Sequence, residues 1–162
     1  MPKRFNNIHW LWLSALAIGL DHATKFLVQH YLVRFQVLPV MPHFNLVNMH
    51  NTGAAFSMFN TAPAAVFVLL AAAVSIAIFV WLKRHPRDHR LVACAFALIL
   101  GGALGNAIDR VVRGFVVDFV QFYVGDWSFA AFNVADSAIT LGAGLLILDM
   151  LLERRRAPDQ AT

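Results

Sequence analysis

Two aspartates, Asp118 and Asp136, are the carboxylates of this sequence that could act together in chemistry. Two carboxylates placed close together at a partly dry boundary cannot both ionise freely, so they tend to share one proton. Such a pair supplies a base and an acid together. The ionised member polarises a water molecule for attack on a peptide carbonyl, and the protonated member stabilises the developing oxyanion. The spacing alone leaves proton relay and structural pairing open as alternatives.

Two further polar groupings stand nearer the N-terminus. Asp21 and Lys25 are spaced i, i+4 with the acid first, the orientation that is favoured for a helical ion pair, and such a pair can simply satisfy itself. Asn51 and Gly53 combine a side-chain amide with a flexible backbone point. That combination suits the close approach of a peptide chain, and a plain turn is an equal alternative.

Polar residues also recur at helical spacing in the second half of the chain. Asn106, Asp109 and Arg110 follow i, i+3 and i+4 and share one helical face, where a guanidinium can fix a carboxylate or backbone carbonyls. Asn133 and Asp136 are spaced i, i+3 near the start of an apolar stretch. Burying an ionisable group there costs about 2.5 to 3.5 kcal/mol or more, so a function should explain it.

Other catalytic patterns are missing from the sequence. It has no Gly-x-Ser-x-Gly elbow, no His-Glu-x-x-His motif and no phosphate-binding loop, so serine hydrolase, zinc protease and nucleotide chemistry lack support. Seven histidines are scattered without a compact ligand pattern, and we expect no metal and no cofactor. The one cysteine, Cys94, lies in an apolar run and is interpreted as a small buried hydrophobe.

The composition indicates a membrane protein. Of 162 residues, 59% are apolar and only 14% are charged, and the mean hydropathy is +0.63, which is beyond an ordinary soluble composition. The formal charge of +4 would fit nucleic acid in another chain. Here the basic residues gather at the two ends of the chain and in one short loop, which is typical of topology signals, so we expect no nucleic-acid partner.

Four apolar stretches are long enough to cross a hydrocarbon core of about 30 Å. We expect one membrane domain over residues 1–162, with spans near 9–28, 61–82, 91–108 and 130–152. The N-terminal pattern also allows a cleaved signal peptide, but the charges that follow it fit the rest of the site, and we expect a retained first span. Segments 29–60 and 109–129 then lie on one side and the loop 83–90 on the other.

The basic residues select the orientation. Nine of the thirteen lie before the first span, in the loop 83–90 or after the last span, so both termini are predicted to be cytoplasmic. The polar residues named above then all lie near the outer face. On that side, the stretches Phe35 to Asn51 and Phe115 to Val124 have strand composition, with turn-forming Gly114 and Gly125. The predicted fold is therefore mainly α, with four transmembrane helices and a small extracytoplasmic sheet over their outer ends.

Five sequence blocks, taken in order, resemble the motifs of the lipoprotein signal peptidase (signal peptidase II) family. They are Asp21-His22-Ala23-Thr24-Lys25, Asn51-Thr52-Gly53-Ala54-Ala55-Phe56, Gly105-Asn106-Ala107-Ile108-Asp109-Arg110, Val117-Asp118-Phe119 and Phe132-Asn133-Val134-Ala135-Asp136. The sequence departs from the family pattern at His22, where Gln is more usual, and at Ala130, where Pro commonly stands. Neither departure falls on a residue of the proposed chemistry.

The resemblance implies a function and a place in the cell. It implies an aspartic endopeptidase of the bacterial inner membrane that removes the signal peptide of a prolipoprotein, cutting just before a cysteine that carries diacylglycerol. It also implies an extracytoplasmic β-cradle, sensitivity to the cyclic peptide globomycin, and contact with membrane lipid. Nothing in the sequence requires more than a monomer.

The resemblance also assigns roles to individual residues. It makes Asp118 and Asp136 the catalytic dyad. The residues implied to hold the substrate backbone or support the dyad are Asn51, Gly53, Asn106, Arg110 and Asn133. The residues implied to shape the site are Asp21 and Lys25, to which the shared helical face adds Asp109.

Two other functions remain as alternatives. A proton-coupled transporter also places Asp and Arg residues inside the membrane, but its site should lie near the midplane with access to both sides. A non-catalytic membrane assembly factor would use the glycine-containing helices as interfaces and would tolerate the loss of either Asp118 or Asp136.

Overall fold

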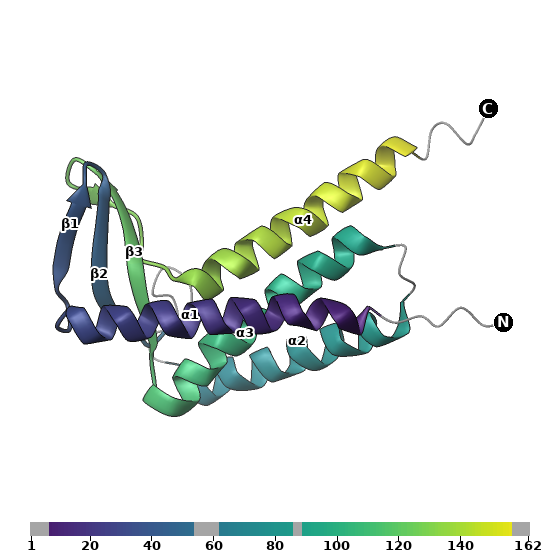
Figure 1. Cartoon of the computed structure of the whole chain (residues 1–162), viewed down its shortest axis with the longest axis horizontal. Helices are drawn as coiled ribbons and strands as arrows, with labels where there is room; N and C mark the ends of the chain where they lie inside the picture. Colours follow the sequence, from purple (N-terminus) through teal and green to yellow (C-terminus); the bar gives the residue numbers. More distant parts are fainter. Residues whose placement is uncertain (1–6, 54–61, 86–88, 157–162) are drawn as a thin grey trace.

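The computed structural model describes residues 7–53, 62–85 and 89–156, with side chains described as far as Glu153. It consists of a helical bundle with a small antiparallel sheet at one end (Figure 1). The elements in chain order are the 3-10 helix η1 (Ile8–Trp10), α1 (Leu11–Tyr31), β1 (Val37–Met41), β2 (Phe44–Asn51), α2 (Ala64–Arg84), α3 (Arg90–Arg113), β3 (Val116–Val124), β4 (Trp127–Ser128) and α4 (Val134–Arg156).

Within the described residues, four helices are long and apolar enough to cross a membrane, as the composition predicts. Helix α3 is the centre of the bundle and packs against each of the other three. Close packing depends on small residues. A Cβ on Gly101 would lie 2.8 Å from Ala17 Cβ, which is closer than side-chain carbons approach one another, so this glycine lets α1 and α3 touch.

The sheet has the order β1-β2-β3-β4, and every neighbouring pair is antiparallel. It lies at the end of the bundle where α1 and α3 end and α4 begins, while the start of α1 and the end of α4 lie at the other end (Figure 1). The predicted small sheet beside one set of helix ends is therefore confirmed. Gly114 and Gly125 both have positive φ, as expected of turn residues at the two ends of β3.

All four helices differ by a few residues from the apolar stretches that predict them, and α3 and α4 differ most. Helix α3 continues to Arg113, because Asp109 pairs with Arg113 one turn later and Gly114, at φ +80°, closes the helix with a left-handed cap. Helix α4 begins at Val134, since Phe132 still pairs with Val120 of the sheet. Asp109 therefore lies inside a helix instead of in the segment that follows it.

An apolar cluster fixes the sheet on the bundle. Val28 and Leu32 at the end of α1 pack with Val117 and Phe119 of β3, and all four side chains are buried. Each such side chain contributes about 1.5 to 3 kcal/mol of burial free energy. Because Asp118 lies between the two β3 members of the cluster, its backbone position is set by apolar packing on the opposite face of the strand.

Candidate active site

Asp118 lies in the buried half of β3, where its side chain is 3% exposed. The register of the sheet pairs it with Met49 of β2 and pairs Asn51 with Val116. Asn51 is therefore the diagonal neighbour of Asp118 on the same face, within reach of a side-chain contact. Asn51 Nδ2 donates a hydrogen bond to Asp118 Oδ2 at 3.0 Å. Strand pairing alone thus brings together two predicted residues that are 67 positions apart in the sequence.

Asp136 lies in the first turn of α4, where it completes a capping box. Asn133 is the residue before the helix, and its Oδ1 accepts a hydrogen bond from the backbone N–H of Asp136 at 2.9 Å. In return, Asp136 Oδ2 accepts from the backbone N–H of Asn133 at 3.3 Å. This reciprocal pair satisfies two amides at the helix start and fixes the direction of the carboxylate. The helix dipole there also favours a negative charge on Asp136.

The Asn133 side chain joins the two aspartates. Its oxygen caps α4 at Asp136, and its Nδ2 donates to Asp118 Oδ1 at 2.7 Å. Burial raises the pKa of Asp118 to about 7, and the charge of Asp136 acts in the same direction. The hydrogen bonds from Asn51 and Asn133 and the charge of Lys25 oppose that rise in pKa. Near neutral pH, Asp118 is therefore poised to hold a proton.

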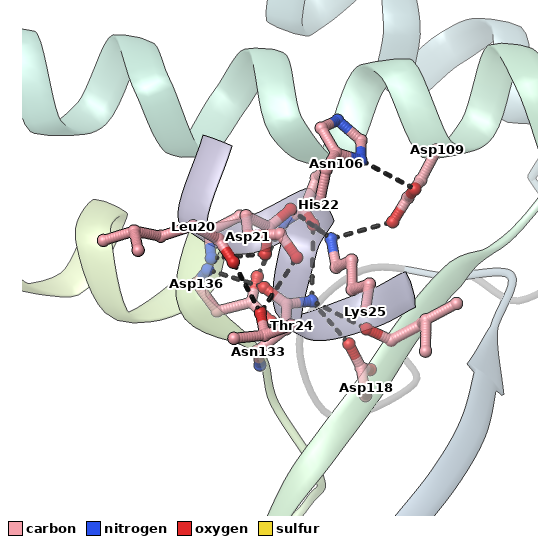
Figure 2. A network of polar contacts seen from close by, with 12 residues as sticks. Leu20, Asp21, His22, Thr24, Lys25, Asn106, Asp109, Asp118, Asn133 and Asp136 are labelled. Atoms are coloured by element: carbon pink, nitrogen blue, oxygen red, sulfur yellow. Dashed lines mark hydrogen bonds and ion pairs between the residues drawn. The ribbon is translucent and has the colours of Figure 1, made fainter. Parts of the chain in front are cut away.

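Behind the two aspartates lies a network of fully buried charges (Figure 2). Lys25 Nζ lies 2.6 Å from Asp21 Oδ2 and 2.8 Å from Asp109 Oδ2, and all three side chains have no exposed surface. The same ammonium group donates to Asn106 Oδ1 at 3.1 Å. Asn106 Nδ2 in turn donates to Asp136 Oδ1 at 2.8 Å. The expected Asp21–Lys25 pair is thus present, and it includes Asp109 as a second carboxylate.

Asp21 also holds the start of α4 from a different helix. Its Oδ1 accepts a hydrogen bond from the backbone N–H of Ala135 at 2.9 Å, one of the amides that have no partner inside α4. Gly105 makes the approach possible, because a Cβ there would lie 3.0 Å from Asp21 Oδ2 and 3.4 Å from Ala135 Cβ. Gly105 therefore lets α3 approach a charged group of α1.

Asp109 carries two more basic neighbours. Arg113, one turn further along α3, pairs with Asp109 Oδ1, and His22 Nδ1 lies 3.7 Å from the same oxygen. The i, i+4 spacing of Asp109 and Arg113 matches that of Asp21 and Lys25, so this partner could have been found from the sequence. His22, which stands where Gln is more usual in the family, is half-buried at the edge of the network.

Arg110 points to a different part of the site. It donates to the backbone carbonyl of Gly53 and, at 3.3 Å, to that of Asn106, so it binds carbonyls rather than a carboxylate. Its guanidinium also lies over the ring of Phe67 in α2, 4.7 Å from the centroid. Its Nε–H is buried and has no partner among the described residues. Phe67 was missed from the sequence, since nothing distinguishes it from other apolar residues of its span.

The structure brings most of the expected site residues into one cluster at the sheet end of the bundle. One connected set of contacts includes Asp21, Lys25, Asn51, Asn106, Asp109, Asp118, Asn133 and Asp136. Gly53 joins through Asn51, whose Oδ1 accepts from the Gly53 N–H at 2.9 Å, and through Arg110. The rest of that motif, residues 54–56, lies outside the described residues.

The described part of the chain holds no cluster of side chains that could bind a metal ion. Within residues 7–53, 62–85 and 89–156, no three His, Cys, Asp or Glu side chains converge in a way that could hold a metal ion. The His85 ring stacks on the Trp81 ring, with centroids 4.3 Å apart, which is a packing contact.

Comparisons with known proteins agree with this geometry. A family model described as signal peptidase (SPase) II matches residues 13–152. The lipoprotein signal peptidase of Alteromonas mediterranea is 47% identical over 150 residues, which cover 91% of this chain and 82% of the relative. That of Photorhabdus laumondii is 43% identical over 164 residues, which cover 99% and 96%.

Solved structures show the same fold. A bacterial membrane enzyme determined by the in meso method at 2.3 Å resolution superposes with a TM-score of 0.84 at 28% identity, covering 95% of this chain and 94% of that one. A second such structure, at 1.9 Å resolution, gives a TM-score of 0.80 at 28% identity, covering 93% and 98%.

Proposed function

This chain belongs to the signal peptidase II family, and from that membership we propose that it is an aspartic endopeptidase that removes signal peptides from prolipoproteins. The bond cut is the one before a cysteine that carries diacylglycerol. Asp118 and Asp136 form the catalytic pair. One observation supports this assignment above all others: Asn133 donates from its side chain to the Asp118 carboxylate and from its backbone N–H to the Asp136 carboxylate, so one residue holds both carboxylates.

The surroundings of the two carboxylates favour different protonation states. Asp136 receives N–H donors from Asn106 and from the Asn133 backbone, and it lies at a helix start, and each of these contacts stabilises its carboxylate form. Asp118, with its pKa raised to about 7, holds the shared proton. At neutral pH the pair therefore starts as one carboxylate base, Asp136, and one carboxylic acid, Asp118.

The reaction follows from this division of roles. The Asp136 carboxylate takes a proton from a water molecule as the water oxygen attacks the peptide carbonyl carbon. The Asp118 carboxyl gives its proton to the carbonyl oxygen, which forms a neutral tetrahedral intermediate. Asp136 then passes its proton to the leaving nitrogen as the C–N bond breaks, and Asp118 recovers its proton from the hydroxyl group. Both side chains return to their starting states.

Nearby amides and cations are placed to hold an extended peptide. The loop that follows β2 carries Gly53, fixed by Asn51 on one side and Arg110 on the other. The unused Nε–H of Arg110 is an additional donor for a carbonyl of the substrate. A buried donor without a partner is costly, so its satisfaction by substrate contributes to binding.

The membrane setting fits a lipidated substrate. A diacylglyceryl group reaches the sheet end of the bundle by lateral diffusion, and its acyl chains match an apolar bundle better than water. We propose a multi-pass protein of the bacterial inner membrane with both termini cytoplasmic and the site near the extracytoplasmic face. A monomer contains every residue assigned a role here, and globomycin is the expected type of inhibitor.

The transporter alternative requires polar groups near the midplane with access to both sides. The connected polar cluster lies instead at the start of α4, where Asp21 of α1 binds the Ala135 N–H, and it extends through the second halves of α1 and α3 toward the sheet residue Asp118. This one-sided placement favours a peptidase that receives its substrate at a membrane boundary.

A cleavage assay tests the proposed function. Purified protein in lipid is mixed with a prolipopeptide that carries diacylglycerol on its cysteine, and with the same peptide without lipid. We expect cleavage of the lipidated peptide alone, with mass spectrometry placing the cut directly before the cysteine. Absence of any product, or equal cleavage of both peptides at another bond, would contradict the proposal.

A further inference from the structure

We propose that Lys25 is a positioning residue that holds the side-chain amide of Asn106 with its NH2 group directed at Asp136. This inference rests on the proposed function, because it assigns Lys25 a role in preparing the proposed base. The relevant contacts connect α1, α3 and α4 through one ammonium group and one amide (Figure 2).

The ammonium group of Lys25 has three N–H donors and no acceptor. The structure gives it hydrogen bonds to Asp21 Oδ2 at 2.6 Å and Asn106 Oδ1 at 3.1 Å, and an ion-pair contact with Asp109 Oδ2 at 2.8 Å. Its side chain is fully buried, so water does not compete for these contacts. Lys25 can therefore donate only to the oxygen end of the Asn106 amide.

The orientation of Asn106 decides what Asp136 receives. With Oδ1 toward Lys25, the amide places Nδ2 at 2.8 Å from Asp136 Oδ1. The opposite orientation would put an NH2 group against an ammonium and a carbonyl oxygen against a carboxylate. Both contacts are repulsive, and the cost is high because the site is buried. Asn133 Nδ2, at 3.3 Å from Asn106 Oδ1, favours the same orientation as Lys25.

The two carboxylates beside Lys25 have other partners, so pairing them is not the sole use of its charge. Asp21 Oδ1 accepts from the Ala135 N–H, and Asp109 Oδ1 pairs with Arg113. Asn106 Oδ1 lacks a cation other than Lys25 among the described contacts. Lys25 thus balances the charge of the two carboxylates, and for the Asn106 amide it determines the orientation of the group.

The test uses a double substitution that leaves the net charge of the network unchanged. Lys25→Met alone would leave buried carboxylates unpaired and would cost about 3 to 5 kcal/mol of stability. Lys25→Met with Asp109→Asn removes one positive and one negative charge, and Asp109→Asn alone, which keeps the Lys25–Asn106 contact, is its control. Each is assayed for cleavage of the lipidated peptide as a function of pH, with thermal unfolding measured in parallel.

The charged groups that face Asp136 are Lys25 and Asp21 from α1, Arg110 from α3 and Asp118 from β3. Without an oriented amide donor, Asp136 needs a higher pH to ionise, so the acidic limb of the kcat/KM profile moves upward in pH. We expect that shift in the Lys25→Met/Asp109→Asn variant, with kcat lowered about 10-fold or more at pH 6, and an unshifted limb in Asp109→Asn.

A second comparison separates positioning from a direct charge effect. Lys25→Met/Asp109→Asn is also made in protein that carries Asn106→Ala. There it should cause no further shift of the acidic limb, because the amide through which Lys25 acts is absent. A shift that persists in that background would be a through-space effect and would overturn the proposal. An unshifted limb in the Lys25→Met/Asp109→Asn variant would overturn it as well.

A third measurement needs no change at Lys25. In 15N-labelled protein the side-chain NH2 signal of Asn106, identified by its loss in Asn106→Ala, should follow the ionisation of Asp136 and lose that dependence in Asp136→Asn. If the chemical shift of this signal changes neither with pH nor in Asp136→Asn, the NH2 group of Asn106 does not point at Asp136, and the proposal is overturned. Failure of the proposed function is seen separately, as a wild-type protein that cuts no lipidated peptide.

Discussion

Asn133 Nδ2 donates a hydrogen bond to Asp118 Oδ1 at 2.7 Å, across the junction between helix α4 and strand β3. The same side chain caps α4 with its oxygen, one helical turn before the carboxylate of Asp136. A residue that stabilises a helix start therefore also sets the relation between the two proposed catalytic groups. A change at Asn133 should therefore affect both the stability of α4 and the catalytic pair.

Replacing Asn133 by serine separates its two roles. Serine is a good helix cap but is too short to reach Asp118, whereas alanine is neither cap nor donor. We expect Asn133→Ser to retain most of the stability and to lose about 10²- to 10³-fold in kcat. Asn133→Ala should lose similar activity and about 0.5 to 2 kcal/mol more stability. Full activity in Asn133→Ser would show that its contact with Asp118 is dispensable.

The raised pKa of Asp118 predicts how activity depends on pH. Below about pH 7 the side chain keeps the proton that the reaction requires, and above that pH the proton is lost. We expect kcat/KM to fall as pH rises through about 7. A profile that keeps rising to pH 9 would contradict the assignment of Asp118 as the acid.

Stability should depend on pH through the same group. An acid whose pKa is higher in the folded protein than in the unfolded chain binds more protons when folded. Its contribution is therefore favourable at low pH and decreases as pH rises from about 3.8 to about 7. The decrease in unfolding temperature over that window should be smaller in Asp118→Asn. Parallel curves for the two proteins would argue against the pKa shift.

Several parts of the molecule follow from the sequence alone. Apolar stretches of sufficient length predict the four helices, and β-branched and aromatic residues beside Gly114 and Gly125 predict the sheet. Helical spacing identifies partners on the same helix, such as Asp21 with Lys25. It cannot identify partners on another helix, because those depend on how the helices pack.

The contacts between elements are therefore what the sequence left open. The pairing of Lys25 with Asp109, the stacking of Arg110 on Phe67 and the contact of Gly105 with Asp21 each join two helices. None carries a signal in local spacing. The length of α3 was also underestimated, since apolar content falls before the helix itself ends at Gly114.

Gly105→Ala tests one of these contacts. A methyl group there would lie 3.0 Å from Asp21 Oδ2 and would displace the carboxylate that binds the Ala135 N–H at the start of α4. We expect a loss of about 1 to 3 kcal/mol in stability, with reduced activity because Asp136 belongs to that turn. Gly144→Ala is the matched control, since a Cβ at Gly144 meets nothing within 4 Å. Equal behaviour of the two variants in thermal unfolding would refute the close-contact argument.

Arg110→Lys keeps the charge but loses the planar group that binds two carbonyls and stacks on Phe67. Displacement of the Gly53 loop should lower kcat/KM by up to about 100-fold with little change in folding. Arg34→Lys, at an exposed arginine over the Phe35 ring, should leave both unchanged. Steady-state kinetics on the lipidated peptide compares kcat/KM of Arg110→Lys with that of Arg34→Lys, and equal values would contradict the role of Arg110.

The central claim is that Asp118 and Asp136 perform the cleavage together. The most direct measurement compares cleavage of the lipidated prolipopeptide by the wild type, Asp118→Asn, Asp136→Asn and Asp126→Asn, a change at an exposed turn aspartate, each shown to be folded. We predict that each of the first two substitutions abolishes cleavage, with a loss of about 10⁴-fold or more, and that Asp126→Asn cuts like the wild type. Cleavage at the wild-type rate by either Asp118→Asn or Asp136→Asn would contradict the account.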